Sequence, residues 1–280
     1  MNAKEKNYWH PAQYAAIQIE LEDYADSLTF GDEYQLTQEP LRIDVYVIKK
    51  DRNVEIKKNI GRIFRAYNLI EFKSQFGYIS VADFHKVNAY GFHYMSINGI
   101  RPTDLTLTLI SRGHPQALFS ELEELGCEVK EVSRGIYHVL GFGLIPIQVI
   151  ETQLLDDDEN LWLKSLVSDI KDRDIVKKIL TKYQEKEKNV NYNTYLSTVL
   201  KANPDIFLEV IESMNEALLK QAVTKVFIEK GWLEEVQRET EQRKATEMAK
   251  NLLSKGMHVA DIVDVTGLSM AEIEALRRSH

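Results

Sequence analysis

Strand-like and helix-like segments alternate through the first half of this chain, and that alternation constrains the fold more than any other feature. Apolar residues at helical spacing, such as Tyr14, Ile17 and Leu21, alternate with runs rich in β-branched and aromatic residues. The expected order is helix, three strands, helix and strand, over residues 8–25, 27–31, 41–48, 64–73, 80–95 and 105–110. This order predicts an α/β sheet sandwich with one core of about 150 residues.

Helix-capping residues, proline and glycine support these boundaries. Ser80 is a good N-cap for the second helix, and Asp83 falls in its first turn. Pro102 and Gly113 bound the strand over 105–110. A further helix over 115–125 and three short strands are expected after it, around residues 129, 136–140 and 145–150.

The pattern changes at Thr152, after which only helical signals occur. One amphipathic helix is expected around Leu161, Trp162, Leu166 and Ile170. The later helices are expected from Asp205 towards Lys230, over 234–255, and as two short helices over 259–276 with Ser269 as an N-cap. The predicted domains are therefore residues 1–152, a helical region over 153–233, and a long helix with a helix-turn-helix-like tail over 234–280.

Composition narrows the class of protein. No apolar run reaches the roughly 18–20 residues needed to span a bilayer, and the first eight residues lack an apolar segment of the secretory type. With Cys127 as the single cysteine, one chain can form neither a disulfide nor a cysteine-based zinc site. We therefore expect a cytoplasmic protein with no membrane partner.

The charge is acidic overall but uneven. A net charge of -8 argues against wide non-specific binding to nucleic acid. Residues 49–65 nevertheless contain seven basic side chains against two acidic ones. The basic ones are Lys49, Lys50, Arg52, Lys57, Lys58, Arg62 and Arg65. This segment is either a solvated hairpin edge or a phosphate-contacting patch. Its position between two strands that carry acidic residues favours the patch.

Those acidic residues form the most informative pattern in the chain. Asp44 interrupts an otherwise apolar strand, and Glu71 and Lys73 lie two apart on another, so both project from one face. If the strands pair as a hairpin, the three side chains can converge. Two close carboxylates repel unless a cation separates them, and Mg²⁺ prefers such oxygen ligands. The alternative is an ordinary cross-strand salt bridge with Arg42 or Lys73.

The residues around this pattern resemble the PD-(D/E)XK nuclease superfamily, and within it the PD-(D/E)XK family transposases related to the Rpn recombination-promoting nucleases. The resemblance rests on Leu41-Arg42-Ile43-Asp44-Val45-Tyr46, Ile70-Glu71-Phe72-Lys73-Ser74, residues 83–90, and residues 135–150. Ile43 stands where the motif's name has proline. The resemblance implies a restriction-endonuclease-like αβββαβ core followed here by a helical C-terminal region.

The resemblance also implies roles for individual residues. Asp44, Glu71 and the backbone carbonyl of Phe72 would hold Mg²⁺, with Mn²⁺ as an alternative, and Lys73 would assist catalysis. Lys86 and Tyr90, one helical turn apart, would face the site or the DNA backbone. Many members carry a glutamate on the first helix, for which Glu20 and Glu22 are candidates; the alternative for both is a solvent-exposed acid.

The tail leaves two interpretations open. The two short helices suit a helix-turn-helix, but the second holds Glu272 and Glu274 before Arg277 and Arg278, which is unfavourable for reading a DNA groove. The long polar helix before them favours self-association, so a homodimer through the C-terminal helices is the other interpretation.

Other chemistries find little support. No G-x-x-x-x-G-K-[ST] loop occurs, and the seven histidines are scattered, with His85 and His93 eight residues apart. The sequence thus predicts a Mg²⁺-dependent DNA endonuclease of the recombination or mobile-element type. The alternatives are a DNA-binding or assembly protein that keeps the fold with weak or lost activity, and a pure protein-interaction module.

Overall fold

The computed structural model describes residues 3–31, 45–51, 53–73, 77–186, 189–213, 224, 227–228 and 231–278. The chain forms two compact units, and each is described by itself below. Unit 1 contains Met1–Ser168 and Lys186–Val199, and unit 2 contains Asp169–Glu185 and Leu200–His280.

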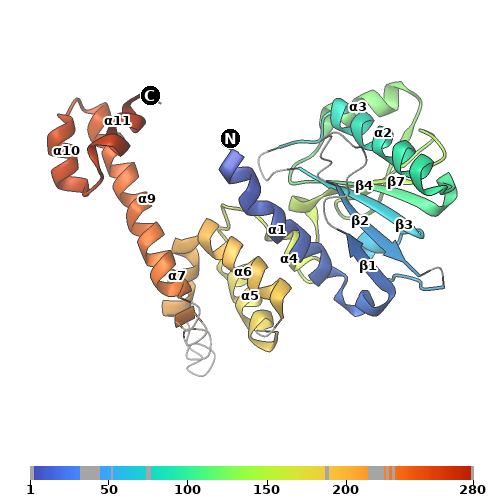
Figure 1. The fold of residues 1–280 in the computed structure, drawn as a ribbon, viewed down its shortest axis with the longest axis horizontal. Helices are drawn as coiled ribbons and strands as arrows, with labels where there is room; N and C mark the ends of the chain where they lie inside the picture. Colours follow the sequence, from blue (N-terminus) through green and yellow to red (C-terminus); the bar gives the residue numbers. More distant parts are fainter. Residues whose placement is uncertain are drawn as a thin grey trace. The chain divides into compact units, whose positions relative to one another are not determined.

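Unit 1 is built on a mixed β-sheet, so the prediction of an α/β fold is confirmed at this level (Figure 1). Within the described residues, seven strands lie in the order β1-β2-β3-β4-β7-β6-β5. Their bounds are β1 Leu28–Gly31, β2 Val45–Lys50, β3 Tyr67–Phe72, β4 Leu105–Ser111, β5 Glu128–Ser133, β6 Ile136–Leu140 and β7 Ile147–Glu151. The neighbours β3, β4 and β7 are parallel, while β1, β2, β5 and β6 pair antiparallel.

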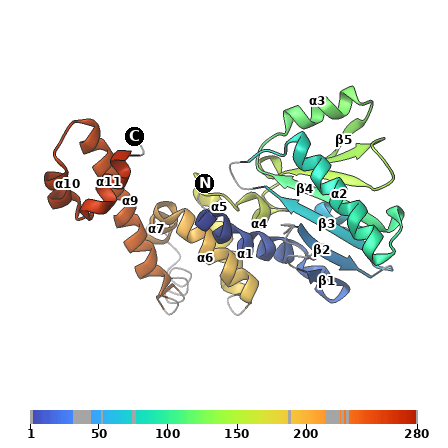
Figure 2. The same cartoon turned by 45° about the horizontal axis from the view of Figure 1, so that its top comes forward.

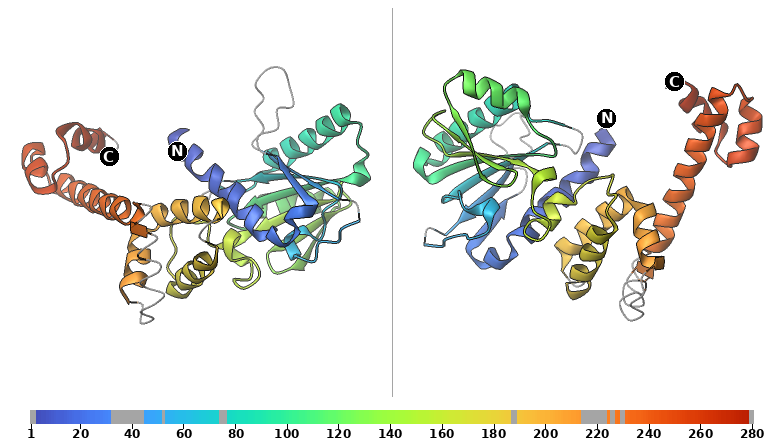
Figure 3. Two further views of the ribbon diagram at one scale, coloured as in Figure 1. Left: turned by 60° about the horizontal axis from the view of Figure 1, so that its bottom comes forward. Right: turned by 180° about the vertical axis from the view of Figure 1, so that it is seen from behind.

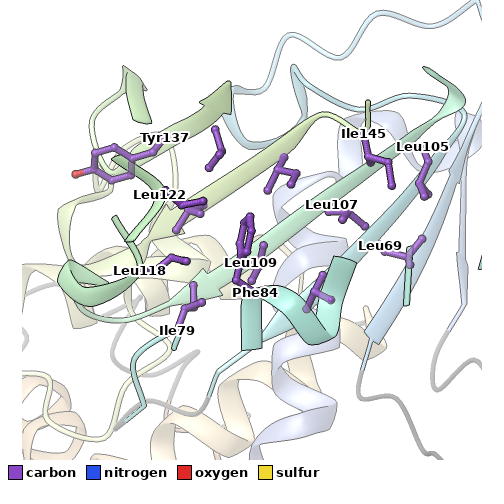
Figure 4. Close-up of a cluster of buried hydrophobic side chains, with 14 of the residues drawn as sticks. Leu69, Ile79, Phe84, Leu105, Leu107, Leu109, Leu118, Leu122, Tyr137 and Ile145 are labelled. Atoms are coloured by element: carbon purple, nitrogen blue, oxygen red, sulfur yellow. The ribbon is translucent and has the colours of Figure 1, made fainter. Parts of the chain in front are cut away.

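Helices cover both faces of this sheet (Figure 2). Leu69, Leu107 and Leu109 pack into one apolar cluster with Phe84 of α2 and Leu118 of α3 (Figure 4). The alternate residues point to the other face, where Tyr46 of β2 stacks on Tyr14 of α1. All seven residues of β4 are buried, as expected for a central strand with both faces covered.

The helices of unit 1 follow from their local sequence. The bounds are α1 Ala3–Glu20, α2 Val81–Asn98, α3 Gln116–Glu124, α4 Leu161–Lys164 and α6 Val190–Ala202, whose last residues belong to unit 2. Ser80 and Asp83 form a capping box at the start of α2, so the predicted N-cap is confirmed. α2 ends at Gly99, whose φ of 63° is the left-handed conformation that glycine adopts without strain.

The predicted helix through Leu161 and Ile170 is shorter than expected. α4 ends at Lys164, and beyond Ser165 the backbone bonds tighten, because the Leu166 N–H donates to the Leu163 carbonyl and the Val167 N–H to the Ser165 carbonyl. The Ser165 hydroxyl donates to the Leu161 carbonyl and contacts the Tyr195 hydroxyl. The Ile170 N–H is bound by the Asn203 side chain. The apolar spacing therefore reflects burial of Leu161 and Leu166 in a short helix and the loop after it.

Unit 2 is helical (Figure 3). It contains α5 Arg173–Glu185, α7 Pro204–Ser213, α9 Trp232–Ser254, α10 Val259–Thr266 and α11 Met270–Arg278. The helix expected beyond Ser213 falls largely outside the described residues. The last three helices share a small apolar core centred on Ala249, Ile262 and Ile273, and Ser269 caps α11 as predicted. Among the described residues, no helix is both long and apolar enough to cross a membrane.

Candidate active site at the end of strand β3

Glu71 and Lys73 lie at the carboxyl end of the parallel strands. Glu71 pairs with Val45 of β2 on one side and with Leu109 of β4 on the other. The backbone N–H of Lys73 donates to the Ile110 carbonyl at 2.8 Å, which continues the ladder past the last residue of β3. Ligand sites in open α/β sheets lie at this end of the strands.

The two side chains are in contact, and a third residue joins them. Lys73 Nζ lies 3.1 Å from Glu71 Oε1 and 2.7 Å from Asp83 Oδ1, at the start of α2. The Glu71 side chain is 3% exposed and that of Lys73 is 21% exposed. One ammonium group is therefore shared by carboxylates from a strand and from the following helix.

Lys73 and its carboxylate partners stabilise each other's charged forms. Burial lowers the pKa of Lys73, but hydrogen bonds and attraction from Asp83 and Glu71 outweigh it, so the pKa is raised. Burial raises the pKa of Asp83, but hydrogen bonds from Lys73 and Ser80 more than offset this, and its pKa is lowered. Both shifts favour the charged forms.

The other predicted metal ligands, Asp44 and the Phe72 backbone carbonyl, stay predictions. Asp44 lies outside the described residues. The Phe72 side chain points to the opposite face and meets Tyr46 edge to face at 6.0 Å. Within the described ranges, no group of three or more His, Cys, Asp or Glu residues is arranged to hold a metal ion.

A small cavity of about 20 Å³ lies beside Lys73. Its lining combines the polar residues Gln13, Ser111, Arg112 and Thr152 with the apolar residues Trp9, Phe72, Ile110, Leu163 and Leu166. A space of this size is close to what one water molecule requires.

Glu20 is not brought to this site. Its Oε1 accepts the backbone N–H groups of Trp162 at 2.9 Å and Leu163 at 3.1 Å, and its Oε2 lies 2.7 Å from Lys58 Nζ. Burial raises the pKa of Glu20, and Lys58 opposes the shift only in part. Glu20 therefore joins α1 to the start of α4. Glu22, the other candidate, pairs with Lys186 at 3.2 Å.

Lys86 and Tyr90 lie on α2, on the same stripe as Asp83. Lys86 is exposed, and its Nζ lies 5.3 Å from the centre of the Tyr90 ring. The two residues continue the surface away from Lys73 along the helix. Whether they face DNA stays a prediction.

The basic segment over residues 49–65 lies at the other end of the hairpin. Lys49 of β2 pairs with Tyr67, four residues before Glu71 on β3, so the connection begins about 13 Å from Glu71 along the strand. Lys50 Nζ donates to the Val54 carbonyl at 2.6 Å, and Arg62 Nε donates to the Lys57 carbonyl at 2.9 Å. This segment therefore lies at the end of the hairpin opposite to Glu71, and its role as a phosphate-contacting patch stays a prediction.

The sequence reasoning also missed a second polar cluster at the carboxyl end of β7. The buried Glu151 carboxylate contacts His114 Nδ1 at 2.9 Å and the Tyr137 hydroxyl at 3.4 Å, and Gln153 donates to its other oxygen. Burial and the Glu151 charge raise the pKa of Tyr137 to about 12. Ser111 is paired with Glu151, so this cluster and Lys73 flank the end of β4. No motif in the sequence signalled it, since His114 and Glu151 are 37 residues apart.

Comparisons of the chain with protein-family models, with curated proteins and with solved structures found no match.

Proposed function

We propose that this protein is a Mg²⁺-dependent DNA endonuclease with its active site at the carboxyl end of β3. The observation that carries the proposal is the contact of Glu71 with Lys73 on one face of that strand, with the ammonium shared by Asp83. A buried carboxylate beside a fixed lysine is the arrangement that the E-x-K motif implies.

The order of elements supports the same conclusion. Unit 1 begins α1-β1-β2-β3-α2-β4, with β1, β2 and β3 antiparallel and β4 parallel to β3. This is the αβββαβ order that the PD-(D/E)XK resemblance implies. We therefore propose a restriction-endonuclease-like core over these elements, with β7, β6 and β5 extending the sheet.

The donor set fits a hard divalent cation. Glu71, Asp44 and the Phe72 carbonyl would hold Mg²⁺, with Mn²⁺ as an alternative, since all offer oxygen ligands. The bound ion would polarise the phosphodiester and acidify a water molecule. Lys73 donates hydrogen bonds from its ammonium group, to the attacking water or to the charge that develops on phosphorus-bound oxygens.

The proposed partner is DNA, and the proposed setting is recombination or the movement of mobile elements in the cytoplasm. Lys86 and the cavity residue Arg112 add positive charge near Lys73. The basic segment over 49–65 would then serve as a separate contact for the DNA backbone. The proposed homodimer would form through the C-terminal helices.

An inactive DNA-binding or assembly protein is the second candidate. The net charge of -8 and the separate apolar core of α9, α10 and α11 favour it, because both suit a protein that acts through partners. Salt dependence distinguishes DNA binding from protein binding, since affinity for duplex DNA falls by about 0.9 log units per phosphate contact for each log unit of salt.

Plasmid cleavage tests the proposal. The wild type is assayed with Mg²⁺ and with EDTA, beside Asp44→Asn, Glu71→Gln and Lys73→Met. Glu22→Gln and Lys177→Met are matched controls, because they remove the same charges outside the site and outside the basic segment over 49–65. We expect nicking with Mg²⁺ only, lost by about a hundredfold or more in the three site variants and kept in both controls. An inert wild type, or a Glu71→Gln protein that cuts as fast, would rule out the nuclease.

A further inference from the structure

Asp83 makes two kinds of contact at once. Its Oδ2 accepts the Ser80 backbone N–H at 3.0 Å and the Ser80 hydroxyl at 2.7 Å, which completes the capping box of α2. Its Oδ1 lies 2.7 Å from Lys73 Nζ. A capping box needs only one carboxylate oxygen, so the second oxygen is available to Lys73.

The contact between Asp83 and Lys73 is the tighter of the two that the lysine makes. The distance of 2.7 Å is in the range of strong charge-assisted hydrogen bonds, whereas Lys73 lies 3.1 Å from Glu71. Asp83 is itself held by the helix cap, and α2 packs on β4 through the apolar cluster. The anchor of the lysine is therefore a rigid one.

This anchor matters because lysine has a long side chain with large rotamer freedom. Without Asp83, the ammonium would pair with Glu71 alone, and Glu71 is the proposed metal ligand. With Asp83, the ammonium is drawn towards α2 and its direction is fixed from two sides. A fixed donor costs less reorganisation when charge develops in the transition state.

We infer that Asp83 is a positioning residue that holds Lys73 in the orientation needed for phosphodiester hydrolysis. The inference rests on the proposed nuclease function, and it assigns Asp83 a role that acts through Lys73. Lys73 contacts the substrate, and Asp83 fixes the position of the Lys73 ammonium group.

A double-mutant cycle tests this inference. Cleavage rates are measured for the wild type, Asp83→Asn, Lys73→Met and the double variant. The asparagine side chain keeps an oxygen for the Ser80 N–H, so the cap is largely retained. We expect Asp83→Asn to lower kcat by roughly tenfold to a hundredfold with little change in the KM for DNA, since misplacing a catalytic group by about 1 Å has such effects. In the Lys73→Met background, Asp83→Asn should lower the rate no further.

Two further variants separate positioning from helix stability. Gly99→Ala strains the other end of α2, where φ is 63° and no atom lies within 4 Å of the added methyl group. It should lower stability and leave kcat within about twofold. Asp83→Glu keeps the charge and a capping-box residue, and should recover most of the lost rate.

The outcomes distinguish a failure of the positioning role of Asp83 from a failure of the proposed nuclease function. If Asp83→Asn slows the Lys73→Met protein by the same factor as the wild type, or slows the wild type no more than Gly99→Ala does, the inference is wrong while the nuclease stands. If the wild type cuts no DNA, the proposed function is wrong, and the same four proteins are compared by urea unfolding. A zero coupling energy there overturns the contact as well, and a favourable coupling supports Asp83 as the anchor of Lys73.

Discussion

Two glutamate–lysine pairs lie at opposite ends of the β2–β3 hairpin in unit 1. Glu20 and Lys58 are 2.7 Å apart, and Glu71 and Lys73 are 3.1 Å apart. Their burial is nearly the same, since the glutamate side chains are 1% and 3% exposed and the lysines 24% and 21%. Distance and burial therefore do not tell the two pairs apart.

The two pairs differ in the other groups that they contact. Glu20 also binds two backbone N–H groups at the start of α4, and Lys58 donates to the Glu159 carbonyl, so this pair ties three segments of backbone together. Lys73 instead binds a second side chain, Asp83, and lies beside a small cavity lined by both polar and apolar residues. A buried ion pair that is bound to backbone is a structural connection, whereas one bound to other side chains beside a cavity can act on a ligand.

The largest expected difference is in stability. Glu20→Ala should lower the free energy of unfolding by about 3 to 5 kcal/mol, because it removes the acceptor of two backbone N–H groups and the carboxylate that neutralises Lys58. Glu71→Ala should cost less, since Lys73 keeps Asp83. Urea unfolding of both variants measures the difference. Equal losses would show that the two pairs are energetically alike.

The reverse difference is expected in catalysis. Under the proposed function, Glu71→Gln should slow Mg²⁺-dependent nicking by about a hundredfold, because the carboxylate of the proposed metal ligand is replaced by an amide. Glu20→Gln should change the rate by less than about threefold, since the glutamine amide oxygen can still accept from the start of α4. A large loss in Glu20→Gln would place Glu20 in the active site after all.

A smaller effect is expected from the cap that supports Asp83. Ser80→Ala should lower stability by about 1 kcal/mol, the usual effect of losing an N-cap hydroxyl. Thermal unfolding detects a change of this size. Thr106→Ser, at a buried position of β4, is a control for removing a small group elsewhere. No change in Ser80→Ala would mean that the capping box does not hold the start of α2.

The last prediction concerns the sign of a pH dependence. The folded protein binds the Glu20 proton more tightly than the unfolded chain, so the stability of the wild type relative to Glu20→Gln should fall as pH rises above 4.5. The pKa of Asp83 is lowered, so its contribution is present above pH 3.8 and is lost as pH falls below it. Unfolding of the wild type, Glu20→Gln and Asp83→Asn between about pH 3 and about pH 7 measures both slopes. If the stability contributions of Glu20 and Asp83 changed with pH in the same direction, the predicted difference between them would be wrong.

Much of unit 1 can be predicted from local signals. Strand β4 shows as Leu105–Ser111, and the capping box at Ser80 and Asp83 marks the start of α2 to the residue. These signals depend only on side-chain chemistry within a few residues. The contact of Glu71 with Lys73 follows in the same way from their spacing on one strand.

The contacts that the sequence did not reveal depend on which ends of the helices and strands lie next to each other. Glu20 stands at the end of α1, next to α4, and nothing local distinguishes it from Glu22. Asp83 reaches Lys73 because α2 begins where β3 ends, which requires the parallel crossover to be known. The cluster of His114 and Glu151 likewise depends on β4 and β7 being neighbours, although many residues separate them in the chain.

Strand β5 is an edge strand of the sheet, and its composition affects whether another chain can add a strand there. An edge strand offers unpaired backbone groups on which another chain can build. β5 carries exposed Glu128, Lys130 and Glu131, and its pairing with β6 shifts between Glu131 and Ser133. Charge and an irregular register both oppose the addition of a foreign strand. This edge therefore opposes the addition of a strand from another chain.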